Sequence, residues 1–221
     1  MRYEAQLAFK QKMVQNNLER IGGLSDFEMY PVIGMETPYA YRNKAQFPVG
    51  EDKDGNIVIG FYAGRTHHIV EQTDCCIGAP ENGEVLRKVK AYMQKNQIRP
   101  YNEEHHSGIV RHILIRTGYH TKEIMVCLIV NAAKASCLKN AEQLTESLRE
   151  MDGMTSVMVN FNTEKTNVIL GKKSEVLWGQ PYIEDFIGDV KYQISPQSFF
   201  QVNPMQTEKP VSYTHLRAHE T

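Results

Sequence analysis

Side chains that could do chemistry concentrate near the end of the sequence, in the stretch ISPQSFFQVNPMQTEK from Ile194 to Lys209. An amide side chain both donates and accepts hydrogen bonds, so Gln201 suits the polar groups of a small-molecule ligand. The alternative is that Gln201 caps the helix that follows. Asn203 stands directly before Pro204, an order typical of the first residues of a helix, and we interpret Asn203 as an N-cap.

Two adjacent aromatics, Phe199 and Phe200, lie in the same stretch. Exposed aromatic rings stack on unpaired bases of RNA, which makes Phe199 a candidate RNA contact. Adjacent aromatics more often divide between the core and the surface, so one ring of the pair is expected to pack inside the domain.

Four cysteines supply the thiols, and no two of them have Cys-x-x-Cys spacing. Cys75 and Cys76 are neighbours, and vicinal cysteines rarely form an unstrained disulfide, so a reducing compartment is expected. Taken alone, such a pair is interpreted as two small buried hydrophobes. Cys127 lies within an apolar strand pattern, and Cys137 opens a helix pattern.

Cations gather in two short stretches. YRNKAQF contains Arg42 and Lys44, and GFYAGRTHH contains Arg65 followed by two histidines. Such side chains bind phosphate, so these three are candidate RNA contacts, although a solvated surface is the plainer interpretation. The pair His105 and His106 is interpreted as part of a loop, because adjacent side chains diverge and no complete set of metal ligands accompanies it.

Composition restricts the class of protein more than its function. The 221 residues carry a formal net charge of -1, which neither indicates nor excludes a nucleic acid partner. No run approaches the roughly 20 apolar residues that a membrane span requires, and the start lacks the apolar core of a signal peptide. The expected location is the cytoplasm, without a membrane partner.

Apolar periodicity predicts the elements that must position these residues. Helices are expected over residues 3–21, 82–97 and 138–148, and Gly22-Gly23 ends the first of them. Strands are expected over residues 45–49, 57–61, 109–117, 123–131, 156–161, 167–170 and 190–195. Alternation places Arg111 and Arg116 on opposite faces of their strand. The predicted fold class is α+β, with a largely antiparallel sheet and flanking helices.

Several motifs in one order resemble the RNA (uracil-5-)-methyltransferases, closest to the bacterial enzymes that modify 23S ribosomal RNA. The motifs are YEAQLAFKQ, YRNKAQF, GFY, CCIGAP, GIVRHILIRTG, TNVILG and ISPQSFFQVNP, and they extend from Tyr3 to Lys209. The resemblance implies an enzyme that uses S-adenosylmethionine to form 5-methyluridine in RNA, more in keeping with ribosomal than transfer RNA. It also implies that Gln201, which matches the glutamine of FFQVN, contacts the methyl donor.

The same resemblance implies a four-iron four-sulfur cluster in the full-length protein. Cys75 matches the position of the fourth cluster ligand, and the other three would precede Tyr3. The family has proline directly after this cysteine, whereas Cys76 stands there in this sequence. That departure weakens the match at Cys75.

Motif order divides the chain into four parts. Residues 1–23 are expected to form a helix that follows a missing N-terminal region, and residues 24–190 the central α+β domain. Residues 191–209 are expected to enter a truncated, Rossmann-like methyltransferase domain. The resemblance places the catalytic cysteine and the donor-binding loop in that domain, so this fragment is expected to be inactive.

The last twelve residues, PVSYTHLRAHET, break the preceding pattern. Back-translated, residues 210–221 can be written as a transposase adapter used in preparing DNA libraries, so we interpret them as a sequencing artefact. The alternative is a natural flexible tail.

Two other readings of the chain as a whole stay open. One is a non-enzymatic RNA-binding module that presents Arg42, Lys44 and Arg65. The other is a structural iron–sulfur or zinc protein built on Cys75 and Cys76, for which the ligand spacing is missing.

Overall fold

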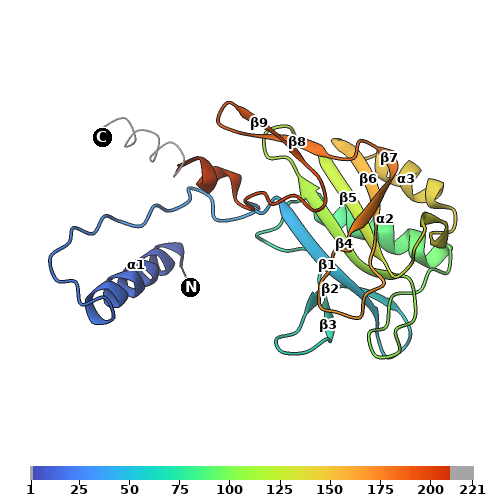
Figure 1. Cartoon of the computed structure of the whole chain (residues 1–221), viewed down its shortest axis with the longest axis horizontal. Coiled ribbons are helices and arrows are strands. Elements are labelled where there is room, and N and C mark those ends of the chain that lie inside the picture. The colour runs from blue at the N-terminus through green and yellow to red at the C-terminus, as the bar shows by residue number, and fades with distance from the viewer. Residues whose placement is uncertain (1, 210–221) are drawn as a thin grey trace. The chain divides into compact units, whose positions relative to one another are not determined.

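The computed structural model describes residues 2–209, and the expected adapter segment, residues 210–221, lies outside them. The chain divides into two compact units, one ending at Pro38 and the other beginning at Tyr39. Each unit has its own hydrogen bonds and packing. Figure 1 shows the elements of both units with their labels.

The first unit is built on helix α1 (Tyr3–Arg20), which confirms the helix expected near the start of the chain. Gly23 has a φ of 65°, a left-handed conformation that glycine adopts without strain just past a helix end. The following segment returns along the helix. The amide of Met35 donates to the Tyr3 hydroxyl at 2.7 Å, and the amide of Val32 donates to Gln11 Oε1 at 3.2 Å. The compact unit therefore extends past residue 23, where the sequence suggested a boundary.

The second unit contains a seven-stranded sheet in the order β3-β2-β1-β4-β5-β6-β7. Neighbouring strands are antiparallel except for the parallel pair β5 and β6. This arrangement confirms the predicted α+β class with a largely antiparallel sheet. The strands are β1 (Lys44–Glu51), β2 (Ile57–Tyr62), β3 (Ile69–Glu71), β4 (Val110–Thr117), β5 (Ile124–Val130), β6 (Met154–Phe161) and β7 (Lys173–Gly179).

Helices α2 (Asn82–Lys95) and α3 (Ala141–Arg149) pack side by side and bury their apolar residues with one face of the sheet (Figure 1). The residues that α2 buries recur at helical spacing, among them Val85, Val89 and Met93, as the sequence predicted. A short 3-10 helix, η1 (Ala135–Cys137), precedes α3. Within residues 2–209, the helices lack the length and apolar character that crossing a bilayer would need.

The opposite face of the sheet is covered by a hairpin of β8 (Ile183–Ile187) and β9 (Val190–Ile194). Ile183 and Ile194 of the hairpin join a second apolar cluster with Leu114, Cys127 and Met158 of the sheet. Burial on both faces explains why β4 and β5 read as nearly continuous apolar runs rather than as alternating patterns.

One expected strand was wrong. Residues 167–170 form a loop, and the strand that follows β6 is β7, which was not predicted. The buried amide of Asn162 donates to the carbonyls of Val168 and Ile169, at 2.6 and 2.9 Å. Because side-chain amides satisfy these backbone groups, the segment needs no neighbouring strand.

Candidate cofactor and RNA site

Residues 39–44, within YRNKAQF and just before it, run beside the cysteine-containing loop. The amide of Ala40 donates to the carbonyl of Cys76, and the amide of Arg42 donates to that of Ile77, both at 2.9 Å. These bonds bring two stretches that lie far apart in the sequence into one neighbourhood.

Asn43 joins the same segment to the FFQVN motif. Its amide donates to the carbonyl of Val202 at 3.0 Å, and its side-chain nitrogen donates to the carbonyl of Gln201 at 2.9 Å. The carbonyl of Asn43 in turn accepts from the amide of Thr117, at the end of β4, at 2.9 Å. Asn43 therefore holds the backbone of Gln201 against the sheet, a role that the sequence did not reveal.

Gln201 itself has an exposed side chain, and no hydrogen bond joins that side chain to another of residues 2–209. The capping role falls to Asn203, whose Oδ1 accepts from the amide of Gln206 at 3.1 Å. Helical residues begin at Pro204, which confirms Asn203 as an N-cap. The side-chain amide of Gln201 is therefore available to bind a ligand, and its contact with a methyl donor stays a prediction.

Arg116 fixes the turn that precedes the motif. Only 2% of this side chain is exposed, and its Nη2 donates to the carbonyl of Pro196 at 3.3 Å and to that of Ser198. Burial lowers the pKa of the guanidinium to about 10, so it stays charged at neutral pH. The sequence signal for this role was an arginine within an apolar run, because a buried guanidinium needs hydrogen-bond acceptors.

The positive charge of Arg116 adds to that of Lys44 and Arg42. Lys44 lies opposite Arg116 in the β1–β4 register. Its pKa is lowered by burial first, and then by Arg116 and Arg42. Among the described residues, none of the three cations forms an ion pair with a carboxylate. Three uncompensated cations at one place favour an anion such as a phosphate.

The two aromatics divide between core and surface, as the sequence predicted. Phe200 is 8% exposed and packs against Tyr192 with ring centroids 5.7 Å apart, whereas Phe199 is 87% exposed. An exposed ring two residues from Gln201 is suited to stacking on a base. The structure therefore brings Arg42, Lys44, Phe199 and Gln201 together, while the RNA role of the first three stays a prediction.

Arg65 does not join this group. It lies in the turn between β2 and β3, with a φ of 62°, and the neighbouring His67 contacts Glu103 at 2.7 Å. The three predicted cations thus belong to two separate surfaces.

The cysteines do not form a metal site within the described residues. Cys75 is half-buried and Cys76 is exposed, so the interpretation of both as buried hydrophobes was wrong for Cys76. Among residues 2–209, no group of three or more histidine, cysteine or acidic side chains is arranged so that it could hold a metal ion. These residues alone do not supply the four thiolates of an iron–sulfur cluster, and Cys75 as a cluster ligand stays a prediction.

Cys127 is fully buried, and burial raises the pKa of its thiol to about 12. Nucleophilic attack requires a thiolate, so this thiol is not a nucleophile at neutral pH, as expected.

No family model matches the chain, but similar proteins do. A Bacillus cereus protein named an uncharacterized RNA methyltransferase is 44% identical over 224 residues, which cover 99% of this chain and 48% of that protein. A Clostridium tetani protein of the same name is 43% identical over 225 residues, which cover 100% of this chain and 48% of that protein.

A solved structure is also similar: the tRNA (uracil-54, C5)-methyltransferase of Pyrococcus abyssi, in complex with S-adenosyl-L-homocysteine. The TM-score is 0.76 at 26% sequence identity, and the match covers 97% of this chain and 48% of that one. The chain spans about half the length of the curated relatives that it matches.

Proposed function

Because the chain belongs to the RNA (uracil-5-)-methyltransferase family, we propose that it forms part of an S-adenosylmethionine-dependent enzyme that makes 5-methyluridine in RNA. In this proposal, the unit that begins at Tyr39 supplies the central domain up to residue 190, and residues 191–209 enter the methyltransferase domain. The enzyme acts in the cytoplasm.

The observation that carries the proposal is the way the sheet holds the FFQVN motif. Asn43 binds the carbonyls of Gln201 and Val202, and Arg116 binds the turn just before them. This leaves the Gln201 amide and the Phe199 ring exposed beside a cluster of cations. An amide suits the polar groups of the methyl donor, a ring suits a base, and cations suit RNA phosphates.

The chemistry of the proposed reaction divides between this chain and residues beyond it. S-adenosylmethionine supplies the methyl group. A cysteine thiolate adds to carbon 6 of uracil, which makes carbon 5 nucleophilic enough to take the methyl group and release S-adenosylhomocysteine. A carboxylate then removes the carbon 5 proton, and the double bond between carbons 5 and 6 re-forms as the cysteine thiolate leaves carbon 6. Cys127 is buried as a neutral thiol, and no other cysteine here matches the family's nucleophile motif. We therefore expect the 221-residue chain to bind its ligands without methylating RNA.

Ribosomal RNA is the proposed substrate, following the resemblance of the motifs to the 23S-modifying enzymes. Transfer RNA is the second candidate, because the similar solved structure is a tRNA methyltransferase. The two substrates call for the same chemistry at carbon 5 and differ in the shape of the RNA that must reach the site.

The experiment uses a chain extended to the length of its relatives, with labelled S-adenosylmethionine and transcripts of 23S ribosomal RNA and tRNA. The expected product in digested RNA is 5-methyluridine, formed faster on the ribosomal transcript. Preference for tRNA would reassign the substrate and keep the reaction. RNA binding without methylation of either transcript would instead favour a non-enzymatic RNA-binding module.

A further inference from the structure

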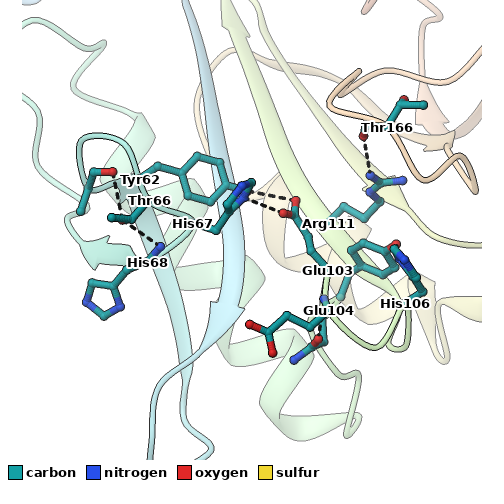
Figure 2. Close-up of polar contacts among 12 residues, drawn as sticks. Tyr62, Thr66, His67, His68, Glu103, Glu104, His106, Arg111 and Thr166 are labelled. Carbon is teal, nitrogen blue, oxygen red and sulfur yellow. Dashed lines mark hydrogen bonds and ion pairs between the residues drawn. The ribbon is translucent and has the colours of Figure 1, made fainter.

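A second polar surface lies around the opposite end of β4 from Arg116. Glu103 and Arg111 line each of three adjoining hollows there, and the largest of the three has a volume of about 290 Å³. We call the three together the Arg111 hollow. Its walls come from β2 and the turn after it, from the loop at residues 100–107, and from the loop at residues 163–169, as Figure 2 shows for the labelled residues.

The floor of the hollow is a pair of buried polar residues. Arg111 is 5% exposed and His112 is 6% exposed. Strand β4 has a register shift between Val110 and His112, so Arg111 is an extra residue in the ladder. Because of this bulge, Arg111 and His112 line the same hollow, which regular alternation along the strand does not predict.

The guanidinium of Arg111 is held by backbone carbonyls and lies over the ring of Tyr101, 4.6 Å from the ring centroid. Nη1 donates to the carbonyls of Asn162 and Glu164 at 2.9 and 2.8 Å, and Nη2 donates to that of Thr166 at 3.4 Å. Its Nε has no hydrogen-bond partner among the described residues, and neither does Nδ1 of the adjacent His112. Buried polar atoms are rarely left without a hydrogen-bond partner, so these two nitrogen atoms indicate that a polar partner is missing.

Tyr62 provides an aromatic wall. Its ring is 41% exposed and lies edge-on to the rings of His67 and His112, with centroids 5.7 and 6.3 Å apart. The Tyr62 hydroxyl donates to Glu103 at 3.5 Å, and Glu103 also accepts from His67 at 2.7 Å. The contact with Glu103 therefore holds the Tyr62 ring in one orientation, and the ring stays partly exposed at the edge of the hollow (Figure 2).

The charges around the rim have two signs. Four carboxylates line it, those of Glu51, Asp52, Glu103 and Glu104. Arg111 lies at the floor, and Lys165 lies on the loop at residues 163–169. A base offers ring and amino donors that carboxylates accept, and a phosphate offers oxygens that cations bind. An aromatic wall with cations nearby is the usual combination for one unpaired nucleotide.

We propose that the Arg111 hollow binds an unpaired nucleotide of single-stranded RNA, with its base stacked on Tyr62 and its phosphate directed to Arg111 and Lys165. The identity of the polymer rests on the proposed function. The hollow is separate from the Gln201 site, because Arg111 and Arg116 lie roughly 15 Å apart along β4. An RNA strand that fills both places must be unpaired at two points, which favours looped substrates over a regular duplex.

The test uses the 221-residue chain and a fluorescent single-stranded RNA of about ten nucleotides in which 4-thiouridine replaces uridine. Crosslinked peptides are mapped, and affinity is measured by anisotropy. Tyr62→Ala should weaken binding about tenfold, since it removes one stacking surface, whereas Tyr62→Phe keeps the ring and should bind as well as the parent chain. Lys165→Glu should weaken binding several-fold, and Lys139→Glu, an exposed control outside the hollow, should not.

Crosslinks within residues 62–68, 100–107 or 163–169 are expected. Crosslinks confined to residues 39–44 and 196–203, with affinity unchanged by Tyr62→Ala and Lys165→Glu, would overturn the hollow as an RNA site and leave the proposed function intact. No RNA binding at all would also overturn it, while methylation by the extended chain decides the proposed function independently. Lys165→Glu keeps the test decisive if Tyr62→Ala fails to fold, because Lys165 is exposed.

Discussion

Gln201 has a backbone that is fixed by Asn43 and a side chain that is left exposed. In the extended chain, Gln201→Ala should weaken binding of S-adenosylhomocysteine about tenfold, because one hydrogen bond to a charged ligand is lost. Isothermal titration calorimetry measures this directly. Gln193→Ala removes an exposed amide from β9 and should leave the affinity unchanged. Equal affinities for Gln201→Ala and the parent chain would remove Gln201 from the cofactor site.

His112 gives the second unit a pH-dependent stability. Burial, and then the neighbouring Arg111, lowers the pKa of His112 from 6.5 to about 4. The unfolded chain therefore binds more protons between these two values, so this contribution is complete above about pH 6.5 and is lost as the pH falls toward 4. The loss by pH 4 is about 3 kcal/mol.

Urea unfolding of the 221-residue chain at pH 7 and at pH 4.5 measures this effect. His112→Gln should flatten the difference between the two pH values relative to the parent chain. An equally steep loss of stability in His112→Gln would show that other groups cause it.

Some residue roles followed from the sequence and others did not. The N-cap at Asn203 and the division of Phe199 from Phe200 were predicted, because each depends on neighbours along the chain. Asn43 and Arg116 were missed as anchors, since their partners lie more than a hundred and about eighty residues away. Residues so far apart in the sequence come into contact only once the sheet has formed, so local sequence patterns do not reveal the contact.

At the scale of elements, a buried asparagine replaces a strand. Asn160 is fully buried in β6, where its Nδ2 donates to the carbonyls of Gly171 and Lys173 and its Oδ1 accepts from the Gly171 amide at 2.7 Å. Asn160→Ala should lower the free energy of unfolding by about 3 kcal/mol, because several buried backbone groups lose their partner. Urea unfolding tests this, with Asn167→Ala, exposed on the same loop, as the control. If Asn160→Ala lowers the free energy of unfolding no more than Asn167→Ala does, the loop keeps its conformation without Asn160.

At the same scale, Arg116 links the sheet to the turn before the proposed cofactor site. Arg116→Lys keeps the charge but presents a compact ammonium in place of a planar fork, so it should hold the two carbonyls less well. Hydrogen exchange of the amides at residues 197–203 should speed up about tenfold, while exchange in β5 stays slow. Unchanged exchange at residues 197–203 would show that Asn43 alone fixes the motif.

Local patterns predicted most elements because helical and strand periodicities differ and the hairpin turns are marked by glycine and asparagine. They failed at residues 167–170, where a β-rich run is held as a loop by Asn162. They also missed β3, β7 and β8, and the burial of β8 comes from packing on the opposite face of the sheet. Both failures reflect tertiary contacts that override local preference.

Across the whole molecule, two polar sites lie at opposite ends of β4, one with Arg116 beside Gln201 and one with Arg111. The sequence motifs located the first, since its residues sit in the stretch that carries the resemblance. The Arg111 hollow was not predicted, because it is assembled from three loops and a bulge that no single motif records. The proposed function assigns the first site to the methyl donor, and the hollow is proposed to bind an unpaired nucleotide of the RNA.

The decisive measurement is tritium release from RNA labelled at carbon 5 of uridine, incubated with the extended chain and S-adenosylmethionine. Methylation at carbon 5 must displace that hydrogen, so tritium should appear in solvent in equal amount to the methyl groups transferred to RNA. Methyl transfer without tritium release would place the methyl group elsewhere and contradict a uracil-5-methyltransferase.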